Sequence, residues 1–169
     1  MSIESLLKRT GLFFVFVLAQ TMVLGRIHLF DYATPLLYVY FVLSFPRNYP
    51  KWAILLWSFF LGLVIDVFSN TPGVAAASLT LIGALQPYVF ELFISRDAAE
   101  NLHPSLRAIG LVKYLYYASF LVLLYCLVFF TLEFFNLSDW VEWLKCVIGS
   151  AVITLVLIMT FESVQGNHE

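Results

Sequence analysis

Six long apolar runs dominate this sequence of 169 residues. A run of about 20 apolar residues crosses a lipid bilayer as an α-helix, because a helix satisfies its own backbone hydrogen bonds where water is absent. The composition agrees: 62% of the residues are apolar and 12% are charged, whereas about a quarter are charged in a typical soluble domain. The sequence therefore predicts an all-α integral membrane protein, a single domain built as a six-transmembrane-helix bundle. The predicted spans are approximately residues 10–25, 33–45, 52–68, 72–94, 109–132 and 143–161.

The first two predicted spans differ from the other four. The first follows Lys8 and Arg9 and resembles the apolar part of a signal peptide, but no small-x-small cleavage site follows it, so we interpret it as a membrane anchor. The second, residues 33–45, corresponds to only about 20 Å of helix at about 1.5 Å per residue. It must include flanking residues or lie where the bilayer is thin.

Lysine and arginine fall mainly in alternate predicted loops. With the N-terminus in the cytoplasm, seven of the nine basic residues are cytoplasmic, in agreement with the excess of Lys and Arg that cytoplasmic loops carry. Without the second span, Arg47 and Lys51 would join Arg26 outside and this excess would disappear. We therefore predict that both termini are cytoplasmic. The seven residues are Lys8, Arg9, Arg47, Lys51, Arg96, Arg107 and Lys113, and the other two are Arg26 and Lys145.

An ionisable side chain, Asp66, lies near the end of the third predicted span, in the stretch FLGLVIDVFSNTPG. Residues four apart share a helix face, so Ser58, Gly62 and Asp66 form a small, polar stripe that a neighbouring helix can approach closely. The fourth span repeats small residues at the same spacing, and the two spans are therefore predicted to pack as a hairpin. These small residues are Gly73 and Ala77, and then Ala76, Thr80 and Ala84.

The turn between these two spans suggests a partner for Asp66. Thr71 is predicted as the N-cap of the fourth helix, and Pro72 suits the first helical position. A helix N-terminus has free N–H groups and a partial positive charge, so Asp66 is predicted to accept hydrogen bonds there and to fasten the hairpin. Arg26 is an alternative or additional partner. A water-exposed interfacial aspartate and a substrate or ion site are the other interpretations of Asp66.

Signatures of enzymes and cofactor sites are absent from the sequence. It contains no GxSxG motif, no HExxH motif and no glycine-rich phosphate loop, so we predict no catalytic centre, cofactor or metal. Cys126 and Cys146 lack the spacing of a redox or metal motif and are interpreted as buried apolar residues. The net charge of −2 argues against a nucleic-acid partner. Membrane lipids are the expected surroundings of the chain.

The pattern Gly62-x-x-x-Asp66, a short polar turn, and then Gly73 followed by small residues resembles the signature region of the MreD family of bacterial rod-shape-determining membrane proteins. The similarity extends to chain length, to a six-span layout, to Pro35 near the start of the second span and to Pro46 at its end. Pro72 departs from the family pattern, in which an apolar residue is common, and the turn is about one residue shorter.

This resemblance implies a nonenzymatic role in the cell-wall elongation machinery of the bacterial inner membrane. The implied partners are MreC and, with it, a RodA-type glycosyltransferase and a penicillin-binding transpeptidase, with MreB contacted indirectly. An alternative is a substrate-binding membrane subunit of a vitamin-type importer, which also has six spans and a similar length. Such subunits carry an Ala-x-x-x-Ala motif in the first span, whereas this span reads GLFFVFVLAQTMVLG, with one alanine.

Overall fold

The protein is an all-α bundle, seen here in a computed structural model that describes residues 3–23, 34–95, 97–99, 101–134 and 139–165. No strand occurs within these residues. A π-helical segment, η1, continues α1 directly. The elements are α1 (Ile3–Leu18), η1 (Ala19–Val23), α2 (Val39–Leu43), α3 (Lys51–Ser69), α4 (Val74–Phe93), α5 (Leu106–Ile109), α6 (Leu111–Glu133) and α7 (Trp140–Gln165).

Four of these helices, α3, α4, α6 and α7, have the length and apolar composition needed to cross a membrane. Their outward faces carry large apolar side chains, such as Phe60, Val67 and Leu92, which are 54%, 72% and 81% exposed. A water-soluble protein rarely exposes so much contiguous apolar surface, whereas lipid chains are a suitable solvent for it. The chain is therefore an all-α membrane protein.

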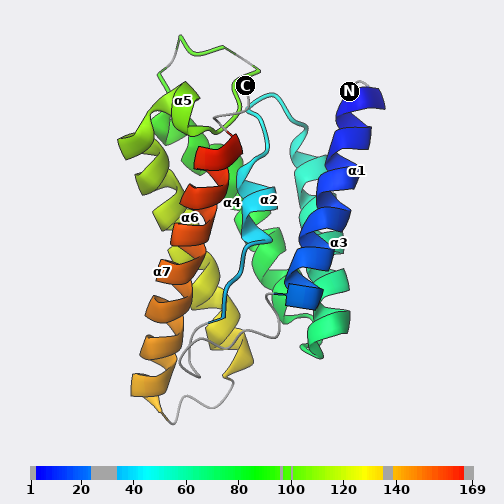
Figure 1. Cartoon of the computed structure of the whole chain (residues 1–169), viewed down its shortest axis with the longest axis vertical. Helices are drawn as coiled ribbons and strands as arrows, with labels where there is room; N and C mark the ends of the chain where they lie inside the picture. The colour runs from blue at the N-terminus through cyan, green and yellow to red at the C-terminus, as the bar shows by residue number, and fades with distance from the viewer. Residues whose placement is uncertain (1–2, 24–33, 96, 100, 135–138, 166–169) are drawn as a thin grey trace.

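Two helical hairpins form most of the bundle. Helices α3 and α4 pack against each other, as do α6 and α7, and a contact between α4 and α6 joins the two pairs (Figure 1). Helix α1 lies beside α3. The bounds of α3, α4, α6 and α7 lie within about four residues of the third to sixth predicted spans. The first helix starts earlier than predicted, at Ile3, and residues 24 and 25 of that predicted span lie outside the described residues.

The prediction of a membrane-spanning helix at residues 33–45 is wrong. Within residues 34–45, which we call the crossing segment, only the five residues of α2 are α-helical, and five residues rise only about 7.5 Å. The crossing segment nevertheless runs lengthwise through the middle of the bundle (Figure 1). Irregular backbone can lie at this depth because the segment is buried in protein and not exposed to lipid.

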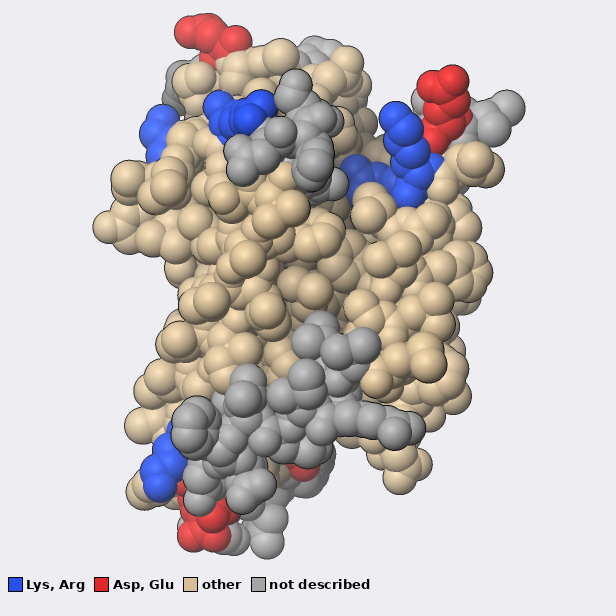
Figure 2. All heavy atoms as spheres, in the orientation of Figure 1, with Lys and Arg blue, Asp and Glu red and all other residues tan. Residues whose placement is uncertain are grey.

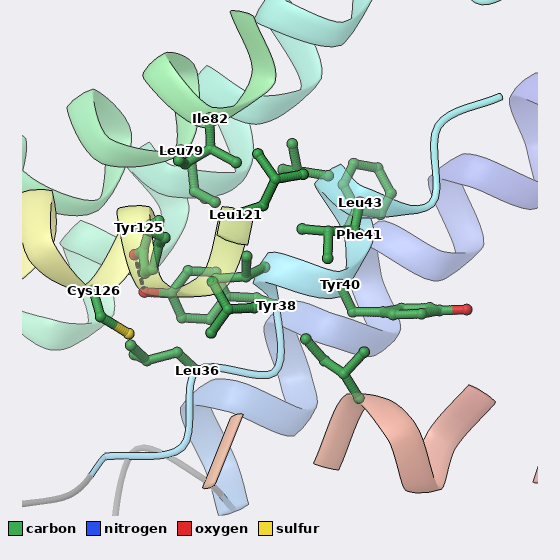
Figure 3. Close-up of a cluster of buried hydrophobic side chains, with 14 of the residues drawn as sticks. Leu36, Tyr38, Tyr40, Phe41, Leu43, Leu79, Ile82, Leu121, Tyr125 and Cys126 are labelled. Carbon is green, nitrogen blue, oxygen red and sulfur yellow. Dashed lines mark hydrogen bonds between the residues drawn. The ribbon is translucent and has the colours of Figure 1, made fainter. Parts of the chain in front are cut away.

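Large side chains of the crossing segment fill the centre of the bundle. Tyr38, Phe41 and Leu43 are at most 1% exposed. They meet Leu79 and Ile82 of α4, among other residues, in the cluster drawn in Figure 3. The core is therefore assembled around the crossing segment by helices on several sides of it.

The ends of the bundle differ in charge. Helix α1 begins and α7 ends at the same end, which also carries α5 and the connection between α2 and α3 (Figure 1). Figure 2 shows most of the visible Lys and Arg side chains at this end. We call it the basic end.

Candidate functional site

The sequence pointed to Asp66, and in the structure this residue joins α3 to α4. Asp66 is 5% exposed. Its Oδ1 accepts hydrogen bonds from Thr71 Oγ1 at 2.9 Å and from the Ala75 N–H at 2.8 Å, and its Oδ2 accepts one from the Ala76 N–H at 2.9 Å. The N–H groups of a first helical turn have no partner within their own helix. The carboxylate of one helix thus caps the next, as predicted.

The conformation of the turn explains why a carboxylate from α3 can reach these groups. Asn70 ends α3 in the left-handed region at φ 57°, and Gly73 is also left-handed at φ 82°. Two left-handed residues three positions apart reverse the chain within the turn, and α4 starts at Val74. Asparagine and glycine are the residues that adopt this region most readily.

The predictions for Thr71 and Pro72 are wrong. Gly73 is the N-cap of α4, and it makes no side-chain capping bond. Pro72 is exposed and lies before the helix. The Asp66 carboxylate takes the place of the capping side chain, while the Thr71 hydroxyl donates to that carboxylate.

The predicted stripe of α3 faces α4. Ser58, Gly62 and Asp66 are all buried. A Cβ atom added to Gly62 would lie 2.4 Å from the Cα atom of Ala76, so the two backbones are in direct contact. Further along the hairpin, a Cβ atom on Gly83 would lie 2.5 Å from the Ser58 Oγ.

The predicted face of α4 is only partly correct. Gly73 and Ala77 are exposed, whereas Ala75, Ala76 and Gly83 are buried. The contact between Gly62 and Ala76 fixes the rotation of α4, and the next residue, Ala77, points about 100° away around the helix. Arg26, the other predicted partner of Asp66, lies outside the described residues.

Polar side chains of several neighbouring elements, among them η1, α4, α6 and α7, bind the backbone of the crossing segment. On one side, Ser150 Oγ accepts from the Thr34 N–H and Thr154 Oγ1 accepts from the Leu36 N–H, each at 3.1 Å. These bonds replace those that a regular helix would make. Three backbone carbonyl groups of the segment accept hydrogen bonds from side chains. Pro35 O accepts from Gln20 Nε2 at 3.0 Å, Phe45 O from Gln86 Nε2 at 3.1 Å, and Leu43 O from Tyr117 Oη at 3.0 Å.

Two tyrosines of the crossing segment add side-chain bonds in opposite directions. Tyr38 shares a hydrogen bond with Tyr125 of α6, and Figure 3 shows this bond and the Tyr40 ring pointing away from it. Tyr40 Oη donates to the buried carboxylate of Glu162 on α7. Glu162 also accepts from the Leu106 N–H at 3.4 Å, so it connects α7 with α5 as well.

These polar residues of the interior were not predicted from the sequence. Gln20, Gln86 and Glu162 are 6%, 1% and 6% exposed. A polar amide or carboxyl group within an apolar run is expensive in lipid and normally faces protein. This signal could have identified all three as interior residues, although it could not have identified their partners.

The described residues contain no group of three or more His, Cys, Asp and Glu side chains arranged to hold a metal ion. Cys126 and Cys146 are free and buried. Comparisons of the chain with family models, curated proteins and solved structures give no significant match.

Proposed function

We propose that this protein is a nonenzymatic membrane scaffold of the bacterial cell-wall elongation machinery, in the bacterial inner membrane. In this role it maintains rod cell shape by holding MreC and, with it, a RodA-type glycosyltransferase and a penicillin-binding transpeptidase, with MreB contacted indirectly. The proposal includes six passes of the chain through the membrane, with the basic end in the cytoplasm.

One observation carries this proposal: several polar side chains of the apolar interior bind the chain's own backbone. Such residues are normally the first candidates for a substrate or proton pathway. Here Asp66 caps α4, and Gln86 and Thr154 satisfy the crossing segment. Groups that are occupied in holding the fold are not free to act on a substrate, so we place the function at the surface of the bundle.

The α3–α4 hairpin supports a scaffold in a second way. Three hydrogen bonds to Asp66 and the backbone contact at Gly62 fix the two helices against each other. A rigid pair of helices presents a constant surface, and a partner helix then binds it with little additional ordering.

The alternative, a substrate-binding subunit of a vitamin-type importer, is favoured by the irregular crossing segment. Broken helices near the middle of the membrane form the binding sites of many transporters. In this chain, however, the backbone groups of the segment are bound by neighbouring side chains, and Tyr38, Phe41 and Leu43 occupy the centre of the bundle. We therefore prefer the scaffold.

Co-purification from native membranes under mild detergent tests the proposal. We expect MreC and the two cell-wall synthases to be recovered with the tagged chain, and depletion of the chain to make rod-shaped cells round. Recovery of an ATPase and a transport subunit would support the importer. Turnover of a lipid-linked cell-wall precursor by the purified chain, lost on mutation of one of its own carboxylates, would contradict the nonenzymatic role.

Cysteine labelling tests the orientation. Ser105 lies at the basic end, next to α5, and Pro72 lies in the turn between α3 and α4. In intact spheroplasts we expect an impermeant thiol reagent to label Pro72→Cys and to leave Ser105→Cys unlabelled until the membrane is opened. Labelling of Ser105→Cys from outside would reverse the proposed orientation.

A further inference from the structure

Arg9 is a buried cation near the basic end of the bundle. Its side chain is 8% exposed. The guanidinium donates to the Ser44 backbone oxygen at 3.3 Å and to Ser44 Oγ at 3.5 Å. Its central carbon lies 4.3 Å from the centre of the Phe45 ring and 5.1 Å from that of the Tyr49 ring. These contacts hold the cation in place, but all of them are with neutral groups.

The charge of Arg9 is not balanced by a carboxylate of the described residues. The ionisable groups that act on its guanidinium are the phenols of Tyr40 and Tyr49, which are neutral at pH 7. Glu162, the buried carboxylate of the same end, is bonded to Tyr40 and to the Leu106 N–H instead. A buried charge without an opposite charge is costly, so the surroundings of Arg9 call for an anion that the described residues do not supply.

A buried hydroxyl without a hydrogen-bond partner lies on a ring that faces Arg9. The Tyr49 hydroxyl is buried and has no hydrogen-bond partner, and its ring faces the guanidinium. Phosphate oxygens accept hydrogen bonds from guanidinium groups in a charge-assisted manner, and they also accept from hydroxyl groups. A phosphate group therefore matches both donors.

We propose that Arg9 and Tyr49 bind the phosphate group of an anionic membrane phospholipid at the basic end. Lys8, the neighbour of Arg9 in sequence, is exposed and adds positive charge. Leu7 and Trp52, at the start of α1 and α3, are 74% and 63% exposed and offer apolar surface to acyl chains. Apolar surface next to a cation favours a lipid headgroup over a free phosphate ion. Figure 2 shows the concentration of basic side chains at this end.

Native mass spectrometry and thermal melting of the full chain in mild detergent test this site. The lipids added are phosphatidylglycerol and the zwitterionic phosphatidylcholine, and inorganic phosphate is tested separately. We expect phosphatidylglycerol to bind more tightly than phosphatidylcholine and to raise the melting temperature more. Arg9→Gln should weaken phosphatidylglycerol binding about tenfold and Tyr49→Phe about threefold, because each removes a hydrogen bond to a charged group. Lys113→Gln, which removes an exposed charge on α6 at the same end, is the matched control and should change binding by less than about twofold.

Three results would overturn the proposal. Unchanged phosphatidylglycerol binding in both Arg9→Gln and Tyr49→Phe would limit Arg9 to its structural contacts. If Arg9→Gln does not fold, phosphatidylglycerol binding by Tyr49→Phe decides this first result alone, since Tyr49→Phe alters no charge. If inorganic phosphate raises the melting temperature as much as phosphatidylglycerol does, the site binds the free ion. Loss of a co-purified protein from Arg9→Gln, with lipid binding intact, would assign it to a partner's carboxylate.

Discussion

The α3–α4 hairpin and the crossing segment both place polar groups inside an apolar bundle, and they satisfy these groups over very different distances in sequence. In the hairpin, Asp66 binds N–H groups nine and ten residues ahead. In the crossing segment, Pro35 is bound by Gln20, 15 residues away, and Leu36 by Thr154, 118 residues away. The hairpin is thus a local structure, whereas the crossing segment depends on the completed bundle.

This difference implies an order of assembly. A local hairpin can form as soon as its two helices are in the membrane, because its contacts need no other part of the chain. The crossing segment has unsatisfied backbone groups until α4, α6 and α7 surround it, and such groups are costly in lipid. We infer that the segment takes its irregular form only when these helices are in place.

The largest effect is expected from Gly62→Leu, which tests the backbone contact of the hairpin. Even a Cβ atom at this position would lie 2.4 Å from the Ala76 Cα atom, so the helices must separate. We expect a loss of about 3 kcal/mol or more in the free energy of unfolding in detergent. Under the proposed scaffold function, we also expect loss of co-purified MreC. Gly11→Leu is the matched control, because nothing lies within 4 Å of an added Cβ there. A wild-type melting curve for Gly62→Leu would contradict the close contact.

Removal of the Asp66 carboxylate should have the next largest effect. Asp66→Ala leaves the Ala75 and Ala76 N–H groups without their acceptors, and we expect a loss of about 2 to 4 kcal/mol. Asp66→Asn keeps one acceptor and the shape, so the loss should be about 0.3 to 2 kcal/mol. Thermal melting of both variants at matched expression measures this. Should Asp66→Asn melt like wild type and yet lose its partners, Asp66 contacts the partner directly.

The corresponding test in the crossing segment is Thr154→Val. Valine keeps the shape of threonine but leaves the buried Leu36 N–H without an acceptor, so we expect a loss of about 1 to 3 kcal/mol. Thr160→Val is the control on the same helix, because the Thr160 hydroxyl is exposed and bonds only within α7. It should change stability by about 0.5 kcal/mol or less. Equal melting temperatures for the two variants would mean that the Thr154 hydrogen bond does not stabilise the crossing segment.

Hydrogen exchange provides a comparison of the two regions in one sample. In Thr154→Val we expect faster exchange of amides in the crossing segment, while the Ala75 and Ala76 amides keep their protection. In Asp66→Asn we expect faster exchange of the Ala75 and Ala76 amides, while the amides of the crossing segment keep their protection. Exchange that rises in both regions for either variant would show that they open as one unit.

The distance between bonded residues also explains how much could be predicted from the sequence. The role of Asp66 follows from Gly62, Asp66 and the following turn, all within about ten residues. The bounds of α3, α4, α6 and α7 follow from apolar runs long enough to be unambiguous. These features were predicted because their causes are adjacent in the chain.

The crossing segment could not be predicted in this way. Residues 33–45 read as a short apolar helix, and nothing within that stretch indicates that Ser150, Thr154 and Tyr117 will bind its backbone. The start of α4 was misplaced for a related reason: Thr71 and Pro72 fit a standard helix start, but a carboxylate from another helix takes over the capping role. Tertiary bonds prevailed over local preference in both places.

The smallest expected effect concerns the face of α4 that the sequence misassigned, and it separates the two possible stripes of small residues. Ala77 is exposed, whereas Ala76 is 4% exposed and lies against Gly62. Ala77→Leu should therefore change the free energy of unfolding by about 0.5 kcal/mol or less, since its side chain points away from α3. Ala76→Leu, one residue earlier, should cost about 1 to 3 kcal/mol through overpacking. Melting of the two variants in detergent measures the difference. A larger loss from Ala77→Leu would mean that α4 is rotated by one residue, and α4 would then present Gly73 and Ala77 to α3.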